Sequence, residues 1–255
     1  MVLAVDIGNS TMVFGLYKGI EHLFCARVKT DALKSEHEYA ILINELLGLY
    51  GRSKEDIKGA VLSSVVPALT AVISDAIRLL SDVSVLSIGP GVKTGLNIRI
   101  DDPSEAGADL VCTAVGAMEK YPLPAIILDL GTATKISVVD QNKNFIGCAI
   151  APGVAVSLGA LSRSAAQLPS IGLKSHIKAI GTNTIDSMLS GSLLGTASML
   201  DGMVARYRKI LGDVPSVVAC GGLVDAVIPH CMTEMTVDKN LLLDGLIAIY
   251  RKNVN

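Results

Sequence analysis

Two aspartates that each close a short apolar run are the residues best placed to do chemistry. Asp6 and Asp129 are both followed by a glycine and by small hydroxyl or amide residues, in 8–11 and 131–134. Glycine lets the backbone approach an anion closely, and backbone N–H groups and short hydroxyls can contact phosphate oxygens. Mg²⁺ takes oxygen ligands and keeps several waters. Two such hairpins bracketing a nucleotide–metal complex would suit phosphoryl transfer, where positioning and charge neutralisation dominate.

The repeated placement of these residues indicates an internal duplication. For either aspartate alone the alternative is a turn former, since Asp-x-Gly is typical of turns. At an offset of 123, residues 6–17 (DIGNSTMVFGLY) and 129–140 (DLGTATKISVVD) share Asp6/Asp129, Gly8/Gly131 and Thr11/Thr134, and Cys25-Ala26 pairs with Cys148-Ala149. We therefore infer two copies of one α/β domain, over residues 1–117 and 118–255.

A third acid, Asp109, closes the segment DDPSEAGAD at 101–109. The pattern predicts a helix over 103–121, on which Glu105 and Asp109 are four residues apart and share a face. Gly107 would leave that face open to a ligand, and a carboxylate there could take a proton from a substrate hydroxyl. The alternative is a solvated first-turn acid that favours the helix dipole.

The elements that must position these aspartates follow from periodicity and turn residues. Strand–turn–strand units are predicted at 2–28 and 125–150, each with an aspartate at the end of its first strand. Helices are predicted at 36–50, 67–80, 183–211 and 241–250, and further strands at 60–64, 83–88 and 217–219.

Composition excludes several other classes. The 255 residues are 50% hydrophobic with a formal net charge of −2, so the chain is not disordered and has no general electrostatic reason to bind nucleic acid or an anionic membrane. Five cysteines without a C-x-x-C argue against a disulfide framework or thiolate zinc site and favour a reducing cytoplasm. The N-terminus has no basic region before Asp6, which argues against a signal peptide. Walker A, dinucleotide-fold, zinc-hydrolase and serine-hydrolase motifs are absent.

Two glycine pairs leave alternatives open. Gly221-Gly222 follows an apolar strand and could let an adenine ring lie against the backbone, or could form a strand-to-helix turn. Gly191 and Gly195 belong to a small-residue stripe with Ser187 and Gly202. That stripe predicts a helix–helix crossing, either between subunits or within the chain.

In combination, these stretches resemble the type III pantothenate kinases over nearly the whole chain. The supporting sequences are DIGNSTMVFGLY, VKTGLNIRIDDPSEAGAD, ILDLGTATKISVVD, FIGCAIAPGVAVSLGAL, IGTNTIDSMLSG and ACGG. More broadly, DIGNS and DLGTAT are similar to the phosphate motifs of the acetate kinase and actin superfamily. The resemblance implies an α/β fold of duplicated ribonuclease H-like (actin-like ATPase) domains with a nucleotide cleft between them. It also implies ATP-dependent phosphorylation of pantothenate, the first step of coenzyme A synthesis, in a cytoplasmic homodimer.

The same resemblance implies roles for individual residues. Asp6 would lie near Mg²⁺, Asp109 would accept the proton, and Asp129 would bind a monovalent cation, K⁺ or NH₄⁺. The ATP-contacting positions would be Asp6, Ile7, Gly8, Asn9, Ser10, Thr11, Met12, Val13 and Thr132. The pantothenate-contacting positions would be Gly107, Ala108, Asp109 and, from the partner subunit, Thr184. The dimer would place that pocket at the subunit interface.

The chain departs from the family pattern at two single positions and in its second hairpin. The family often has Tyr where this chain has Ile100 and Arg where it has Leu110, and its second hairpin commonly reads GTATTFD, so Lys135 replaces a threonine. The lost Tyr and Arg would remove two polar contacts to substrate, while Lys135 could supply a positive charge nearby. These departures keep two alternatives open: a nucleotide-binding regulator with weak or no kinase activity, and a kinase of another small alcohol.

Overall fold

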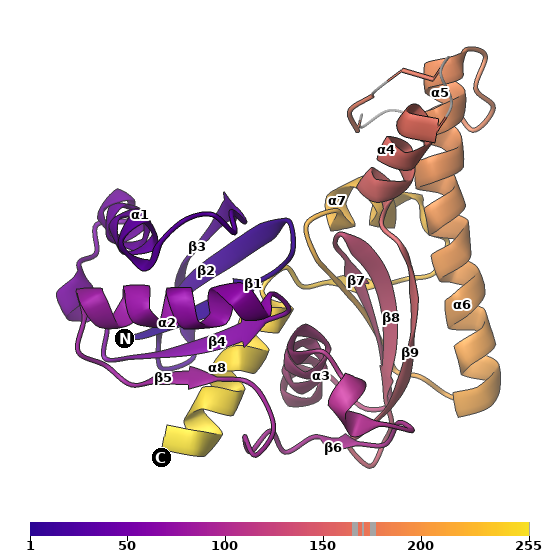
Figure 1. Ribbon diagram of the computed structural model, residues 1–255. Coiled ribbons are helices and arrows are strands. Elements are labelled where there is room, and N and C mark those ends of the chain that lie inside the picture. Colours follow the sequence, from indigo (N-terminus) through magenta and orange to yellow (C-terminus); the bar gives the residue numbers. More distant parts are fainter. Residues whose placement is uncertain (165–167, 170, 174–176, 255) are drawn as a thin grey trace. The chain divides into compact units, whose positions relative to one another are not determined.

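The computed structural model describes residues 1–164, 168–169, 171–173 and 177–254. The chain divides into two compact units, each with its own sheet (Figure 1). Unit 1 comprises Met1–Leu96, Asp102–Glu119 and the segment that begins at Leu241, and unit 2 comprises Asn97–Asp101 and Lys120–Asn240.

Unit 1 is built on a five-stranded sheet in the order β3-β2-β1-β4-β5. Its strands are β1 (Val2–Ile7), β2 (Thr11–Lys18), β3 (Glu21–Lys29), β4 (Gly59–Ser64) and β5 (Val85–Ser87). Its helices are α1 (Glu36–Leu49), α2 (Pro67–Leu80), α3 (Ala108–Lys120) and α8 (Leu241–Val254). β1 pairs antiparallel with β2 and parallel with β4.

Strand alternation decides where Asp6 points. Successive side chains of a strand lie on opposite faces of its sheet. Leu3, Val5 and Ile7 lie in the core that includes α1 and α2, so Asp6 points to the other face. On that face Tyr17 of β2 donates a hydrogen bond to Asp244 of α8 (2.7 Å).

The helices of unit 1 begin at the local signals that the sequence carries. α1 starts with a capping box in which the Ser35 hydroxyl accepts from the Glu38 N–H, while the Glu38 carboxylate accepts from the Ser35 N–H. α2 has Pro67 at its first position, where a missing N–H costs little. Both predicted helices are confirmed to within one residue.

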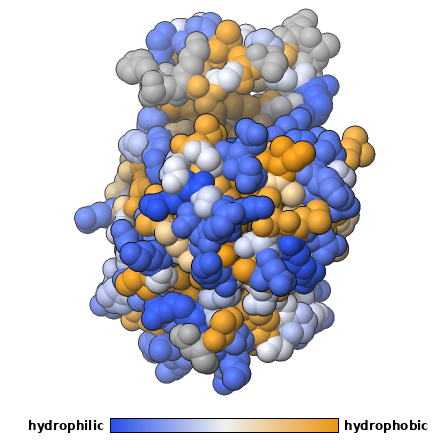
Figure 2. Space-filling model, turned by 90° about the vertical axis from the view of Figure 1, so that its left-hand side faces the viewer, coloured by the Kyte–Doolittle hydropathy of each residue, from blue (hydrophilic) through white to orange (hydrophobic). Residues whose placement is uncertain are grey.

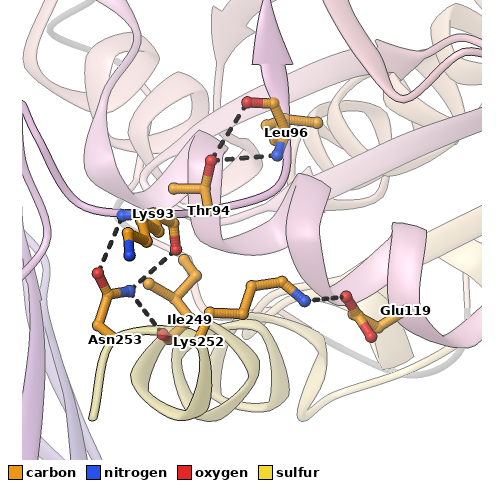
Figure 3. Close-up of polar contacts among 7 residues, drawn as sticks. All are labelled: Lys93, Thr94, Leu96, Glu119, Ile249, Lys252 and Asn253. Carbon is orange, nitrogen blue, oxygen red and sulfur yellow. Dashed lines mark hydrogen bonds and ion pairs between the residues drawn. The ribbon is translucent and has the colours of Figure 1, made fainter. Parts of the chain in front are cut away.

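The C-terminal helix α8 packs within unit 1, so the compact units differ from the division predicted at residue 117. Figure 3 shows how α8 holds neighbouring segments. The Asn253 amide donates to the Lys93 carbonyl oxygen (2.9 Å) and accepts from the Lys93 N–H (3.0 Å), and the Lys252 Nζ pairs with Glu119 of α3 at 2.6 Å. The last helix therefore packs in the unit of the first sheet, and hydrophobic periodicity does not reveal such a long-range contact.

Two glycines allow α3 and α8 to pack backbone to backbone. A Cβ on Gly245 would overlap the Cys112 carbonyl oxygen, and one on Gly116 would overlap the Leu241 carbonyl oxygen. We therefore expect Gly245→Ala to lower the free energy of unfolding by about 1–3 kcal/mol or more, measured by denaturant titration.

Gly48→Ala in α1 is the matched control, because, apart from its chain neighbours and its own helix backbone, no described heavy atom lies within 4 Å of the Cβ it would add. Alanine in a helix is favoured over glycine by roughly 0.5–1 kcal/mol, so this variant should be neutral or slightly stabilised. Equal stability of the two variants would contradict the close packing of α3 on α8.

Unit 2 contains a six-stranded sheet in the order β11-β10-β7-β8-β9-β6. Its strands are β6 (Asn97–Ile98), β7 (Ala125–Leu130), β8 (Ala133–Val139), β9 (Asn144–Pro152), β10 (Ser216–Cys220) and β11 (Thr236–Val237). Its helices are α4 (Val154–Ser164), α5 (Thr184–Leu189), a π-helical turn (Ser190–Leu194), α6 (Gly195–Leu211) and α7 (Val224–Val227).

The two sheets share one topology, which confirms the predicted duplication. In both, an antiparallel three-stranded meander is followed by two parallel strands on the side of its first strand, as β3-β2-β1-β4-β5 and β9-β8-β7-β10-β11. β6 is an addition at the β9 edge, where Asn97 pairs with Asn144. Its segment therefore belongs to unit 2.

One predicted helix and one predicted pairing are wrong. Residues 103–121 do not form a single helix: Pro103–Glu105 is a 3₁₀ turn, and α3 begins only at Ala108. The 123-residue offset also fails to match equivalent residues beyond the hairpin tips. The loop between β1 and β2 has three residues, and the loop between β7 and β8 has two. Met12 pairs with Ile7, and Thr134 pairs with Leu130, so Thr134 corresponds to Met12 and not to Thr11.

The surface near α1 carries scattered apolar side chains. Ile41 and Leu49 are exposed, and Figure 2 shows hydrophobic patches separated by hydrophilic side chains on the side where α1 lies. Single exposed apolar residues are normal for a folded protein. None of the helices in the described ranges combines the length and apolar character needed to span a bilayer.

Candidate active site

Four polar side chains converge on the α8 face of the unit 1 sheet. Asp6 is the penultimate residue of β1, and Ser63 lies beside it near the end of β4, as its partner in the parallel register. Asp6 is half-buried with its Oδ1 atom fully buried, and Ser63 is fully buried. Ser63 was not predicted as a site residue. Its only signal in the sequence is its place near the end of a second buried strand.

The first two turns of α3 supply the other two groups. Asp109 and Cys112 are three residues apart, which places them on one side of the helix. Asp109 is half-buried, and its Oδ1 accepts from the Leu110 N–H (2.8 Å). Burial raises the pKa of the Cys112 thiol well above its ordinary value, and the negative charges of Asp6 and Asp109 raise it further. A hydrogen bond with the Ser63 side chain lowers this pKa, by less than burial raises it. Both carboxylates thus lie within electrostatic reach of one buried thiol.

The Asp109 environment differs from the one predicted. Glu105 is exposed in the 3₁₀ turn and shares no helix with Asp109. A Cβ at Gly107 would lie 2.7 Å from Asp109 Oδ1, so the glycine makes room for that carboxylate. Asp109 is therefore a half-buried acid in the first turn of α3, with a glycine beside its carboxylate.

Burial makes Cys112 an unreactive thiol and leaves Cys148 as the accessible one. Cys112 and Cys220 are buried, and Cys148 is exposed. Burial raises the pKa of Cys25, and it raises that of Cys231 to about 11. Because the thiolate is the reactive form, we expect a single fast phase with a thiol-specific disulfide reagent on the folded protein. Cys148→Ser should abolish that phase, and fast modification of Cys112 would contradict this packing.

The hairpin after Asp6 is closed by its own backbone. The Gly8 N–H donates to the Thr11 carbonyl oxygen (3.2 Å), and a Cβ on Gly8 would lie 2.8 Å from that oxygen. Thr30, directly after β3, holds the loop, since its hydroxyl donates to the Gly8 carbonyl (2.6 Å) and its N–H to the Ser10 carbonyl (3.1 Å). The result is a fixed loop with its middle residues on the surface.

The eight residues predicted to line phosphate, positions 6–13, therefore differ in exposure, with Asp6, Gly8 and Val13 half-buried. Asn9, Ser10 and Thr11 are exposed. The side chains of Ile7 and Met12 are fully buried in the core, so only their backbone could face a ligand. Strand alternation produces this split, because the predicted run crosses from β1 into β2.

The second hairpin, in unit 2, is shaped by close backbone approaches. Thr132 is exposed at its tip. Its carbonyl accepts from the Gly153 N–H (3.0 Å), and a Cβ on Gly153 would overlap this tip. Gly221 has a φ of +99°, and a Cβ on it would lie 2.6 Å from the Leu130 carbonyl oxygen. Gly221 thus forms the turn between β10 and α7, the second of the two predicted alternatives. Gly153 is a packing glycine that no sequence motif indicates.

Asp129 is paired with a lysine of its own hairpin. Lys135 Nζ lies 2.6 Å from Asp129 Oδ2, and both side chains are 14% exposed. The two residues are cross-strand partners of β7 and β8. An ammonium group therefore lies where the resemblance predicts a monovalent cation.

Thr184 lies away from these hairpin residues within unit 2. It starts α5 and lines a groove of about 1100 Å³ between α4 and α5–α6. Leu128 and Leu130 of β7 belong to the core on that side of the sheet, so Asp129 points to the opposite side. Gly191 and Gly195 also line the groove. A Cβ added to either glycine would have no described atom of another segment within 4 Å. The described residues thus make no intrachain helix crossing at these glycines.

The carboxylates of unit 1 fit Mg²⁺ better than a metal with an all-protein site. Among residues 1–164, 168–169, 171–173 and 177–254, no group of three or more His, Cys, Asp or Glu could hold a metal ion. Mg²⁺ is usually held by one or two carboxylates, with waters and substrate phosphates as its other ligands. Asp6, with Asp109 nearby, meets that description.

Comparison with known proteins gives a consistent result. The profile of the type III pantothenate kinase family matches residues 2–206. A type III pantothenate kinase of Halalkalibacterium halodurans is 40% identical over 254 residues and covers all of both chains, and one of Brevibacillus brevis is 41% identical and covers 99% of each. The fold is shared with a putative Baf family transcriptional activator of Campylobacter jejuni (TM-score 0.61, 17% identity, 99% of each chain). It is also shared with a ROK family glucokinase of Streptomyces griseus solved with glucose and AMPPNP (TM-score 0.55, 12% identity, 99% of each chain).

Proposed function

Because the chain belongs to the type III pantothenate kinase family, we propose that it transfers the γ-phosphoryl group of ATP to the terminal hydroxyl of pantothenate. This reaction forms 4'-phosphopantothenate and ADP, and it is the first step of coenzyme A biosynthesis. The observation in the structure that carries the proposal is the pair of half-buried carboxylates, Asp6 and Asp109, around the Ser63–Cys112 floor.

We propose that Asp109 accepts the proton of the pantothenate hydroxyl. A half-buried carboxylate beside a glycine can accept a hydroxyl proton as the oxygen attacks phosphorus. The Leu110 N–H holds Oδ1 at 2.8 Å, which fixes the carboxylate and directs Oδ2 to the substrate. Gly107 and Ala108 would contact the same substrate, because they lead directly into this turn.

We propose that the hairpin loops bind the phosphates of the nucleotide. The exposed polar residues at positions 9–11 and Thr132 offer hydroxyl, amide and backbone donors. Asp6 would hold Mg²⁺ directly or through water, and the bound ion would neutralise charge on the phosphates. The chain's own contribution is to fix the loop, through Gly8 and Thr30, before the nucleotide arrives.

We further propose a homodimer in which Thr184 reaches the pantothenate of the partner subunit. Two observations support it. Thr184 lies in the α4–α6 groove, on the side of the unit 2 sheet opposite to Asp129, and the glycine stripe opens into that groove. A groove lined by small residues accepts a second helix closely. Sedimentation should give a dimer, and Gly191→Leu should weaken it.

The test of function is product formation from a panel of small alcohols. With ATP, Mg²⁺ and pantothenate we expect equimolar ADP and 4'-phosphopantothenate by mass spectrometry. A different preferred alcohol would make the chain a kinase of another compound, and nucleotide binding without turnover would make it a regulator. Leu110 is one of the departures that motivate the regulator alternative. Its side chain is buried (7% exposed), so it contributes to packing and does not contact substrate.

A further inference from the structure

The ion pair between Lys135 and Asp129 differs from the ion pairs of the surface. Its atoms lie 2.6 Å apart and both side chains are 14% exposed. The Lys239–Asp225 pair has the same 2.6 Å separation, yet its side chains are 52% and 72% exposed. Surface pairs gain little because water screens them, whereas a largely buried charge needs a partner. Lys135 is therefore a fixed counter-charge of Asp129.

The internal repeat shows that this lysine is particular to the second hairpin. Val13 is the cross-strand partner of Asp6, as Lys135 is of Asp129. The corresponding position thus carries an apolar side chain in the first copy and an ammonium in the second. Asp129 and Lys135 share the face of the unit 2 sheet away from the α4–α6 core, which is set by Leu128 and Ile136.

An added cation at Asp129 would meet strong repulsion. A monovalent ion bound to this carboxylate would lie within about 4 Å of the ammonium, where two unit positive charges repel. That repulsion lowers affinity about fivefold in bulk water and about 10³-fold at an effective dielectric constant near 20. The residues present at Asp129 therefore do not fit a second monovalent cation. The lysine ammonium already supplies one compact positive charge with three N–H donors.

We propose that the Lys135 ammonium takes the place of a monovalent cation at Asp129, so that this chain works without K⁺ or NH₄⁺. The proposal rests on the proposed kinase function. It assigns Lys135 as a positioning residue that neutralises Asp129 next to the Thr132 tip. No covalent step is involved, and the charge at the hairpin is the same as with a bound cation.

The test compares wild type with Lys135→Thr in potassium chloride and in tetramethylammonium chloride, at an equal ionic strength of about 0.1 M so that screening is constant. For wild type we expect the phosphorylation rate to differ by less than about twofold between the salts, a change small against a tenfold, 1.4 kcal/mol effect. For Lys135→Thr we expect at least about a tenfold loss in tetramethylammonium and recovery in K⁺ or NH₄⁺.

A second readout does not depend on turnover. Thermal unfolding with Mg²⁺ and ADP should show K⁺-specific stabilisation of Lys135→Thr and none of wild type, because a ligand of the folded state raises its melting temperature. If no buffer supports pantothenate phosphorylation, the proposed function fails, and this melting comparison still decides the role of Lys135. Lys135→Met retains the apolar stem and serves if the threonine variant does not fold.

The matched control is Lys239→Thr, which removes the exposed ion pair of equal length. It should behave as wild type in both salts. Three results would overturn the proposal: wild type that K⁺ activates tenfold or more, Lys135→Thr that is fully active without K⁺, or Lys135→Thr that K⁺ does not restore. The last result would mean that the lysine contacts the phosphates itself.

Discussion

Replacing Asp109 with asparagine should lower kcat for phosphorylation of pantothenate by about 10²- to 10⁴-fold, the usual range for loss of a general base. The amide oxygen can still accept from the Leu110 N–H, as Oδ1 does now at 2.8 Å, so the first turn of α3 should keep its geometry. The pantothenate KM should change little, since an interaction made only in the transition state affects kcat and kcat/KM equally. Steady-state kinetics with an ADP-coupled assay measures both constants.

Glu105→Gln is the matched control for this variant. It removes an exposed carboxylate four residues earlier, in the 3₁₀ turn and not in α3, and should leave kcat within about twofold, as for a surface change away from the reacting atoms. If Asp109→Asn retained wild-type kcat, the proton would leave by another group and the assignment of Asp109 would be wrong.

Asp6→Asn should have the second large effect. The side chain lies near the end of β1 with its Oδ1 atom buried, and an amide carries no charge to offset Mg²⁺. Loss of even an indirect partner of a metal typically costs about 10–100-fold in affinity or activity, so we expect at least that loss. The Mg²⁺ concentration for half-maximal rate should rise, which a magnesium titration at saturating pantothenate will show.

Asp75→Asn on α2 controls for the loss of one negative charge. Asp75 is exposed and pairs with Arg78 on the same helix (2.9 Å), and such pairs contribute little. Its Mg²⁺ dependence should match wild type. An unchanged magnesium titration for Asp6→Asn would remove Asp6 from the phosphate site.

The architecture follows from the sequence because both copies carry the same local signals. The aspartate-tipped hairpins became β1–β2 and β7–β8, and the shared strand order followed from them. The packing of elements far apart in the chain could not be predicted from the sequence. The return of α8 to unit 1 depends on the Gly116 and Gly245 contacts, and nothing in a helical pattern tells which sheet a terminal helix covers.

The roles of the predicted site residues stay predictions, and the structure adds geometry that the sequence does not contain. Sequence alone could not show that Ser63 lies beside Asp6, because that pairing joins strands more than 50 residues apart. It also could not show the one-residue difference in hairpin length that brings Lys135, and not its neighbour, opposite Asp129. Register decides which side chain meets a carboxylate, and a slip of one residue turns every side chain to the other face.

The most direct test of the account is a phosphorus NMR time course of the purified protein with ATP, Mg²⁺ and pantothenate. We expect the γ-phosphate resonance of ATP to fall while a phosphomonoester resonance rises in equal amount with ADP, and neither change with Asp109→Asn over the same period. ATP that stays intact, or that yields only inorganic phosphate, would contradict pantothenate phosphorylation by this chain.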